Sequence, residues 1–119
     1  PVINEIEFVV QNSDGSDSST IARAKQGDTI ALSDGASYSV YVRATYAGAI
    51  QGNFSVEGIP TVIRDFTSAG SGERRIRVNP GGAWGGRFFT TSLKYAVNVA
   101  DSADPARKAT MTFEIGVFV

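Results

Sequence analysis

Apolar and polar side chains alternate with a period of two along most of this 119-residue chain, and no stretch shows the 3.6-residue period of a helix. The clearest case is SYSVYVRAT, residues 37–45, in which every second side chain from Tyr38 to Ala44 suits a core and the others are Ser, Tyr, Arg and Thr. Successive side chains of a β-strand point to opposite faces of its sheet. The pattern therefore predicts strands with one buried and one solvated face, which favours antiparallel over parallel sheets.

Glycine-rich and polar turns separate the alternating segments at intervals of about 8–12 residues, as in all-β sandwiches. Seven to nine strands are expected, within residues 2–10, 21–24, 29–32, 37–45, 48–56, 62–66, 73–78, 93–99 and 109–119. Residues 11–20, 79–86 and 100–108 are expected to form loops. The predicted fold is all-β, an antiparallel two-sheet β-sandwich that forms a single domain over residues 1–119.

Histidine and cysteine are both absent from the chain. Their absence excludes a Ser-His-Asp triad, a cysteine nucleophile, a zinc finger and a haem held by either residue. Glycoside hydrolysis by two carboxylates remains open in principle, but the five glutamates are scattered over predicted strands with no shared pocket. We therefore expect a protein that is not an enzyme and needs no cofactor. The aspartate pairs in the loop segments 14–17 and 101–104 are interpreted as turn caps, and they leave calcium binding open.

The net charge of −1 gives the chain no bulk attraction to nucleic acid, and no apolar run approaches the ~18 residues of a membrane span. We expect neither nucleic acid nor a membrane as a partner. The charge is nevertheless uneven. Residues 1–60 hold seven acidic and three basic residues, a net charge of −4, whereas residues 61–119 hold five acidic and eight basic residues, a net charge of +3.

Two stretches, residues 27–58 and 93–119, resemble bacterial immunoglobulin-like modules. In the first, a G-D-x-I-x-L strand precedes an alternating strand that ends in R-A and a Gly-rich turn; the matching residues are Gly27, Asp28, Ile30, Leu32, Val42, Arg43, Ala44, Phe54 and Gly58. The second resembles the last hairpin of such modules through Val99, Asp101, Thr110, Thr112, Phe113, Ile115 and Val117. The resemblance covers about half of the chain and implies an immunoglobulin-like β-sandwich.

Modules of this kind are commonly appended to secreted polysaccharide-active enzymes and to adhesins, and immunoglobulin-like domains also decorate phage virions. The resemblance therefore implies a non-catalytic accessory domain that binds carbohydrate or acts as a spacer, outside the cell or on its surface. The alternative is a virion structural protein, or a surface subunit that assembles with other subunits through its edge strands, its C-terminal strand above all. A start at Pro1 fits both an excised module and a complete chain that has lost its Met.

Arginine and tryptophan point to a candidate ligand site. Arg75 and Arg77 are expected on one face of a strand, about 6.6 Å apart along it, and Trp84 with Arg87 follows in the loop. Guanidinium groups bind carboxylate or sulfate, and an indole face stacks on a sugar ring. We predict that Trp84, Arg75, Arg77 and Arg87 form the ligand-binding site, with an acidic polysaccharide as the ligand.

The same residues also have purely structural interpretations. The arginines fit an ordinary solvated strand face on which they pair with Glu73, Asp65 and Glu57, and Trp84 can instead close one end of the sandwich. Tyr41 and Tyr46 are candidates for an aromatic platform on the outer face, although tyrosine is also a common sheet residue.

Overall fold

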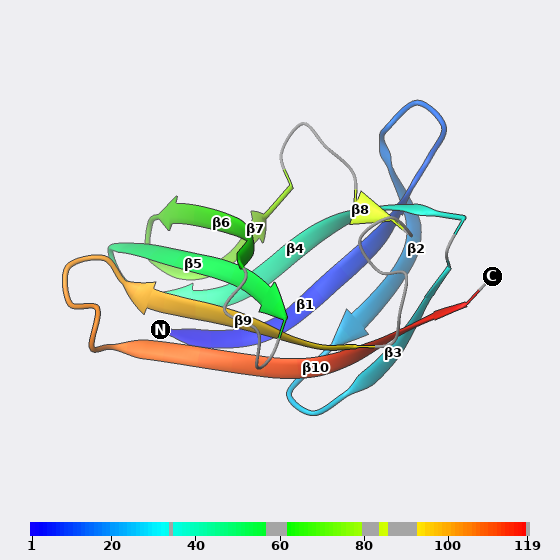
Figure 1. Cartoon of the computed structure of the whole chain (residues 1–119). Helices are drawn as coiled ribbons and strands as arrows, with labels where there is room; N and C mark the ends of the chain where they lie inside the picture. Colours follow the sequence, from blue (N-terminus) through cyan, green and yellow to red (C-terminus); the bar gives the residue numbers. More distant parts are fainter. Residues whose placement is uncertain (34, 57–61, 80–83, 86–92, 119) are drawn as a thin grey trace.

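The computed structural model is all-β in the residues it describes, which are 1–33, 35–56, 62–79, 84–85 and 93–118. Within these ranges there are nine strands of five or more residues and one two-residue strand, β8. The strands form two sheets that pack face to face around one core, as a sandwich does (Figure 1). The predicted all-β class and the two sheets are therefore confirmed, and the described residues form ten strands where seven to nine were expected.

Sheet A contains the N-terminal hairpin and runs in the spatial order β2-β1-β4-β7, with β8 paired to the far end of β4. All of its pairs are antiparallel. Its strands are β1 (Val2–Gln11), β2 (Asp17–Ala24), β4 (Ser37–Tyr46), β7 (Gly72–Arg77) and β8 (Trp84–Gly85).

Sheet B runs in the order β3-β10-β9-β5-β6. Its strands are β3 (Thr29–Ser33), β5 (Ala49–Val56), β6 (Val62–Ala69), β9 (Leu93–Asp101) and β10 (Lys108–Phe118). The β3–β10 pair is parallel, from Thr29 beside Glu114 to Ser33 beside Phe118, so the expectation of a purely antiparallel sandwich is wrong at this one pair. Parallel neighbours need a long connection, and here most of the chain lies between the two strands.

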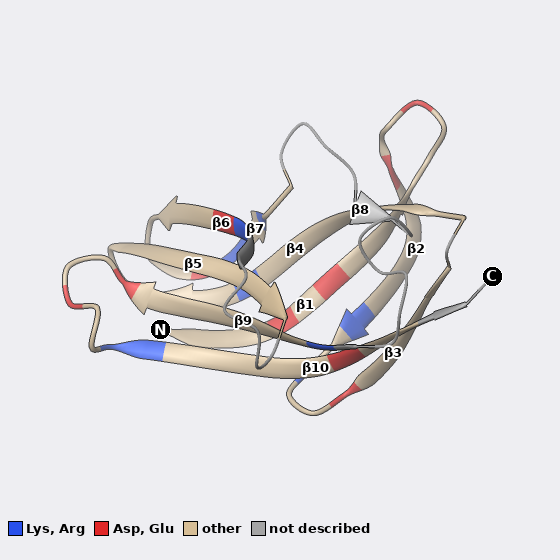
Figure 2. Ribbon diagram, viewed as in Figure 1, with Lys and Arg blue, Asp and Glu red and all other residues tan. Residues whose placement is uncertain are grey.

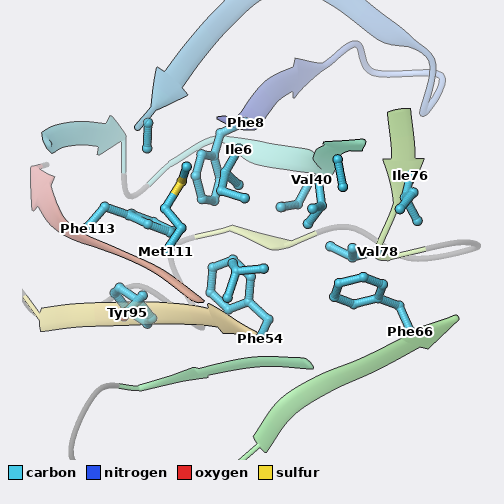
Figure 3. Close-up of a cluster of buried hydrophobic side chains, with 14 of the residues drawn as sticks. Ile6, Phe8, Val40, Phe54, Phe66, Ile76, Val78, Tyr95, Met111 and Phe113 are labelled. Atoms are coloured by element: carbon cyan, nitrogen blue, oxygen red, sulfur yellow. The ribbon is translucent and has the colours of Figure 1, made fainter. Parts of the chain in front are cut away.

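The core lies between the sheets and is rich in aromatic side chains (Figure 3). Phe8 of sheet A packs edge to face against Phe54 and Phe113 of sheet B, with ring centroids 6.4 and 6.1 Å apart. Such aromatic pairs add to the free energy gained by burying their area. Phe66 of β6 and Val78, which follows β7, belong to the same buried cluster (Figure 3). These contacts close the sandwich without any disulfide, because the chain has no cysteine.

The alternation in β4 is confirmed residue by residue. Val40, Val42 and Ala44 are fully buried in the core, and the intervening side chains lie on the outer face of sheet A. Tyr46 continues the inward series, is only 6% exposed and hydrogen-bonds Ser68 through its hydroxyl. The predicted platform of Tyr41 and Tyr46 is therefore wrong, because the two rings lie on opposite faces of the strand.

Two loop boundaries also differ from the prediction. Residues 17–20 belong to β2 rather than to a loop, because Gln11 pairs with Asp17 across a tight turn in which Gly15 has a φ of 85°. At the other site, the backbone of Trp84 and Gly85 pairs with Tyr38 and Ser37, so residues 79–86 are not loop throughout. Both segments are too polar or too rich in glycine for alternation to reveal their pairing, which is made by backbone groups.

Candidate functional site

The outer face of sheet A carries a network of charged side chains centred on Glu7. This carboxylate is only 1% exposed, although it points away from the core. Arg43 donates a hydrogen bond from Nε to Glu7 Oε2 at 2.7 Å, and Arg75 donates one from Nε to Oε1, also at 2.7 Å. Arg23 lies farther away, with its Nε 3.9 Å from Glu7 Oε2. Three strands, β1, β4 and β7, thus supply the two close ion pairs.

Neighbouring groups fix these arginines further. The guanidinium carbon of Arg75 lies 3.6 Å from the centroid of the Tyr41 ring, a cation–π contact. The Tyr41 hydroxyl hydrogen-bonds Asp17, and Arg43 also donates to Glu73 at 3.0 Å. The face therefore holds its arginines in set orientations against carboxylates.

The electrostatics of the network favour a carboxylate that stays ionised. Burial raises the pKa of Glu7, but the hydrogen bonds from Arg43 and Arg75 outweigh burial and hold the pKa below its ordinary value. Asp17 also has a lowered pKa, because it accepts hydrogen bonds from Ser39 and Tyr41. Four carboxylates on this face, of Glu5, Glu7, Asp17 and Glu73, lie among the arginines of β2, β4 and β7. The face thus offers an incoming anion little net positive charge.

The four residues predicted as the ligand site are only partly placed by the structure. Arg75 and Arg77 share the outer face of sheet A, as expected, and Arg77 donates from Nη2 to Ser39 Oγ at 3.3 Å. Arg77 Nε is buried and has no hydrogen-bond partner among the described residues. The backbone of Trp84 pairs with Tyr38 in β8, but its side chain lies outside the described part, as does all of Arg87. The four-residue site therefore stays a prediction.

The outer face of sheet B is different, because it is hollowed into an open groove of about 400 Å³. The groove crosses β6, β5, β9 and β10, and sequence reasoning missed it. Its lining mixes polar and apolar groups, and its two charged side chains, Asp65 and Lys108, lie on the outer strands, whereas β5 carries no charge (Figure 2). The lining residues on β5 and β6 are Gln51, Gly52, Asn53, Asp65, Phe66 and Thr67, and those on β9 and β10 are Asn98, Val99, Ala100, Lys108, Ala109 and Thr110.

The polar side chains of the groove form two rungs that cross four strands in register. One rung consists of Asp65, Asn53, Asn98 and Thr110, and the other consists of Thr67, Gln51, Ala100 and Lys108. Facing residues on neighbouring strands point to the same side of a sheet. The two rungs are about 6.8 Å apart, the length of two residues along a strand.

Hydrogen bonds run one way along the first rung. Thr110 Oγ1 donates to Asn98 Oδ1 at 2.8 Å, and Asn98 Nδ2 donates to Asn53 Oδ1 at 2.9 Å. Four polar groups of the groove have no hydrogen-bond or ion-pair partner among the described residues: Asn53 Nδ2, the Asp65 carboxylate, the Gln51 amide and the Lys108 ammonium. The side chain of Asn53 is bonded through its Oδ1 alone. The groove therefore presents several donors and acceptors that a ligand can engage.

A sequence signal for this groove was present but weak. Asparagine is depleted in strands, yet Asn53 and Asn98 both occupy outward positions in alternating segments. Solvation of an outer sheet face does not by itself require two asparagines within strands. What the sequence does not give is that β5 and β9 are neighbours, in the register that sets these two residues side by side.

No protein-family model matches the chain, and no curated protein is significantly similar to it in sequence. Within the described ranges, no three acidic residues lie close enough together to hold a metal ion. The described part of the chain also contains no helix of the length and apolarity that crossing a bilayer requires.

Proposed function

We propose that this chain is a non-catalytic module that binds polysaccharide in the groove on the outer face of sheet B. The observation that carries the proposal is the row of hydrogen-bonding side chains that crosses four strands without filling the groove. A sugar chain offers many hydroxyl groups that both donate and accept, and amides, hydroxyls and a carboxylate are the groups that recognise them. A volume of about 400 Å³ falls within the range of small-ligand sites.

The proposal includes an immunoglobulin-like fold, which the strand order supports. Immunoglobulin sandwiches place strands C, F and G in one sheet with C′ beyond C in variable-type domains, and strands A, B and E in the other. The orders β10-β9-β5-β6 and β1-β4-β7 match these two sets. The chain also crosses between the sheets from β4 to β5, from β6 to β7 and from β7 to β9, as that topology requires.

The groove is a better candidate for the main ligand site than the arginine face, which is the outer face of sheet A with its charged network around Glu7. On the arginine face, Arg43 and Arg75 are already bonded to Glu7, so a polysaccharide anion must compete with an internal carboxylate. In the groove, the hydrogen-bonding groups of Gln51 and Asp65 have no such competitor among the described residues. We accordingly propose that the module belongs to a larger bacterial protein that is secreted or lies on the cell surface, where it encounters polysaccharide.

Affinity electrophoresis in gels with neutral and acidic polysaccharides tests the proposal. Ala100 is a small outward residue on the groove floor, and the variant Ala100→Trp is expected to fill the groove and abolish retardation. The matched control is Thr45→Trp, which places the same ring on the exposed outer face of sheet A and is expected to leave retardation unchanged. A wild-type protein that no polysaccharide retards overturns the proposal.

The arginine site is tested in the same gels. The ligand lies on sheet A instead if acidic polysaccharides no longer retard Arg75→Gln, Arg77→Gln or Trp84→Ala, while they still retard Ala100→Trp as they do the wild type. The opposite pattern supports the groove.

A second candidate function is assembly with other subunits, and the sheet edges favour it. The edge strand β6 spans eight residues and pairs only with β5 in the described structure. The C-terminal strand expected to pair with a neighbouring subunit is less suited, because its residues 114–118 pair with β3 and residues 108–115 pair with β9. Native mass spectrometry distinguishes the two functions, since a strict monomer at high concentration excludes assembly.

A further inference from the structure

We infer that Asp65 and Asn53 bind a pair of adjacent hydroxyl groups on one uncharged sugar unit, so that the groove selects polysaccharides with free vicinal diols. This inference rests on the proposed function and names the ligand chemistry of the same groove. It starts from one pair of facing residues at the β6 side of the groove.

Asp65 and Asn53 face each other directly across the β5–β6 pair. Their Cβ atoms are therefore about 4.5–5.5 Å apart and point to the same face. Asp65 is exposed, and Asn53 is half-buried beside it. Both side chains line the groove, so their polar ends are open to a ligand.

The hydrogen bonds of the rung fix which atoms of Asn53 remain available. Because Asn53 Oδ1 accepts from Asn98 Nδ2, the amide plane is held with Nδ2 as its free end. The Asn98 amide is held in turn by Thr110, which donates to its oxygen. The result is a pure donor, Asn53 Nδ2, next to a pure acceptor, the Asp65 carboxylate. In this orientation Asn53 presents its amide N–H groups, rather than its oxygen, on the side of the facing Asp65 carboxylate.

A vicinal diol complements this pair of groups. Two adjacent hydroxyls donate to the two oxygens of one carboxylate, and one of their oxygens accepts from the amide N–H. Hydrogen bonds to an ionised carboxylate are about twice as strong as neutral ones. A site built to bond hydroxyls also rejects an analogue that lacks them, because its own polar groups are then left unpaired.

The charge at this position argues for an uncharged sugar unit. Among the described residues, Lys108 is the one basic side chain that lines the groove, and it stands on the other rung at the far side, on β10. An acidic sugar unit bound at Asp65 brings a second carboxylate next to the first, which is unfavourable. The preference for neutral polysaccharide is the reverse of the acidic ligand predicted from the arginines.

The test uses gels that contain β-1,4-glucomannan, soluble starch or β-1,3-glucan. The first two polymers have a free 2,3-diol on their sugar units, whereas the units within a β-1,3-linked chain have no two adjacent free hydroxyls. We expect the wild type to be retarded by at least one of the first two and not by β-1,3-glucan. Periodate cleaves vicinal diols, so a gel made with periodate-oxidised, borohydride-reduced polymer is expected to lose its effect.

Variants separate this inference from the proposed function. Asp65→Ala is expected to weaken binding at least 10-fold, and Asp14→Asn, in an exposed turn of the other sheet, is expected to leave it unchanged. Thermal unfolding checks that both variants are folded. If Ala100→Trp abolishes binding while Asp65→Ala and periodate treatment do not, the groove binds polysaccharide but the diol inference is wrong. If no polymer retards the wild type, both fail. Equal binding to β-1,3-glucan also overturns the diol inference.

Discussion

At the scale of single residues, Glu7 is the side chain whose environment departs most from its sequence pattern. Its position in β1 predicts a solvated outer face, yet it is as buried as the core. Arg43 and Arg75 cover it, and each is itself about one third exposed. Long arginine side chains can cover a strand face with their stems while their charged heads reach water. The alternation thus gives the face on which a side chain lies but not its burial.

We predict that Glu7→Ala lowers the free energy of unfolding by about 1–3 kcal/mol, because two arginines then lose their buried partner. The partly exposed arginines can recruit water, which keeps the loss below that of a fully buried pair. The measurement is urea unfolding followed by circular dichroism. Glu5→Ala is the control: Glu5 Oε1 lies 3.6 Å from the Nε of Arg43 and is more exposed, so its removal is expected to change stability by less than about 1 kcal/mol. Equal losses in both variants would contradict this account.

Gly52 is required for a packing reason rather than for its backbone freedom. A Cβ atom at this position would lie 2.4 Å from the Phe66 ring and 2.7 Å from the carbonyl oxygen of Asn98. We predict that Gly52→Ala destabilises the fold by about 1–3 kcal/mol, the usual result of overpacking. At Gly35 an added Cβ meets nothing within 4 Å. Gly35→Ala is therefore the control in the same urea titrations, and a result in which it is the more damaging of the two would refute the argument.

At the scale of elements, the strands differ in how many neighbours they have. β4 lies between β1 and β7, and β9 lies between β5 and β10, whereas β2 and β6 pair on one side only in the described structure. Backbone N–H groups that point away from a neighbour are bonded to water and open more readily. Local sequence pattern does not separate these classes, because central and edge strands alternate alike.

We predict that amide hydrogen exchange is slowest in β4 and β9 and clearly faster in β2 and β6. Exchange measured by mass spectrometry after proteolysis resolves these strands. The edge strands β2 and β6 serve as each other's control, because they lie in different sheets. Protection of β6 equal to that of β9 would reveal a further strand paired to β6, as the assembly function requires.

At the scale of the whole molecule, folding brings together the two oppositely charged halves of the chain. Glu7 from the acidic half lies against Arg75 from the basic half, joined by two strand pairings through β4. The charge asymmetry that pointed to an acidic ligand is thus satisfied in part inside the protein. A charge balance read along the sequence says nothing about which charges are neighbours.

The molecule is predicted to lose stability in acid, because the ion pairs of Glu7 with Arg43 and Arg75 require an ionised carboxylate. The pKa of Glu7 is lowered from its ordinary value of 4.5, so folding favours the ionised form. Its contribution is complete above that value and is lost as the pH falls through the lower pKa of the folded state. The charged groups that face Glu7 are Glu5, Arg23, Arg43 and Arg75.

Thermal unfolding between pH 7 and pH 2 measures this loss. The melting temperature of the wild type is expected to fall below about pH 4.5. Asp14, Asp17 and Asp101 also have lowered pKa values, because they accept hydrogen bonds, and they add to the fall. Glu7→Gln is expected to show a shallower fall than the wild type. Parallel curves for the two proteins would show that Glu7 makes no contribution to acid lability.

Much of the fold was open to prediction from the sequence. The period-two pattern gave the all-β class, the inward faces of β4 and β10 and most strand positions, because each depends on neighbours along the chain. It failed at residues 17–20 and at β8, where cross-strand pairing rather than local pattern decides. The outward platform position predicted for Tyr46 was wrong for another reason, because the alternation continued past Ala44 already turns that side chain inward. Of the predicted site, the shared face of Arg75 and Arg77 agrees with the structure, but their engagement with Glu7, Tyr41 and Ser39 was not foreseen.

By itself, the sequence determined that the chain forms two-faced strands, that the core needs no disulfide, and that histidine and cysteine chemistry is absent. Only the tertiary structure decided that Glu7 lies beneath arginines, and that Asp65, Asn53, Asn98 and Thr110 form one rung across four strands. The physical reason is register. Local alternation sets which way a side chain points, whereas long-range strand pairing and core packing set which side chains it meets.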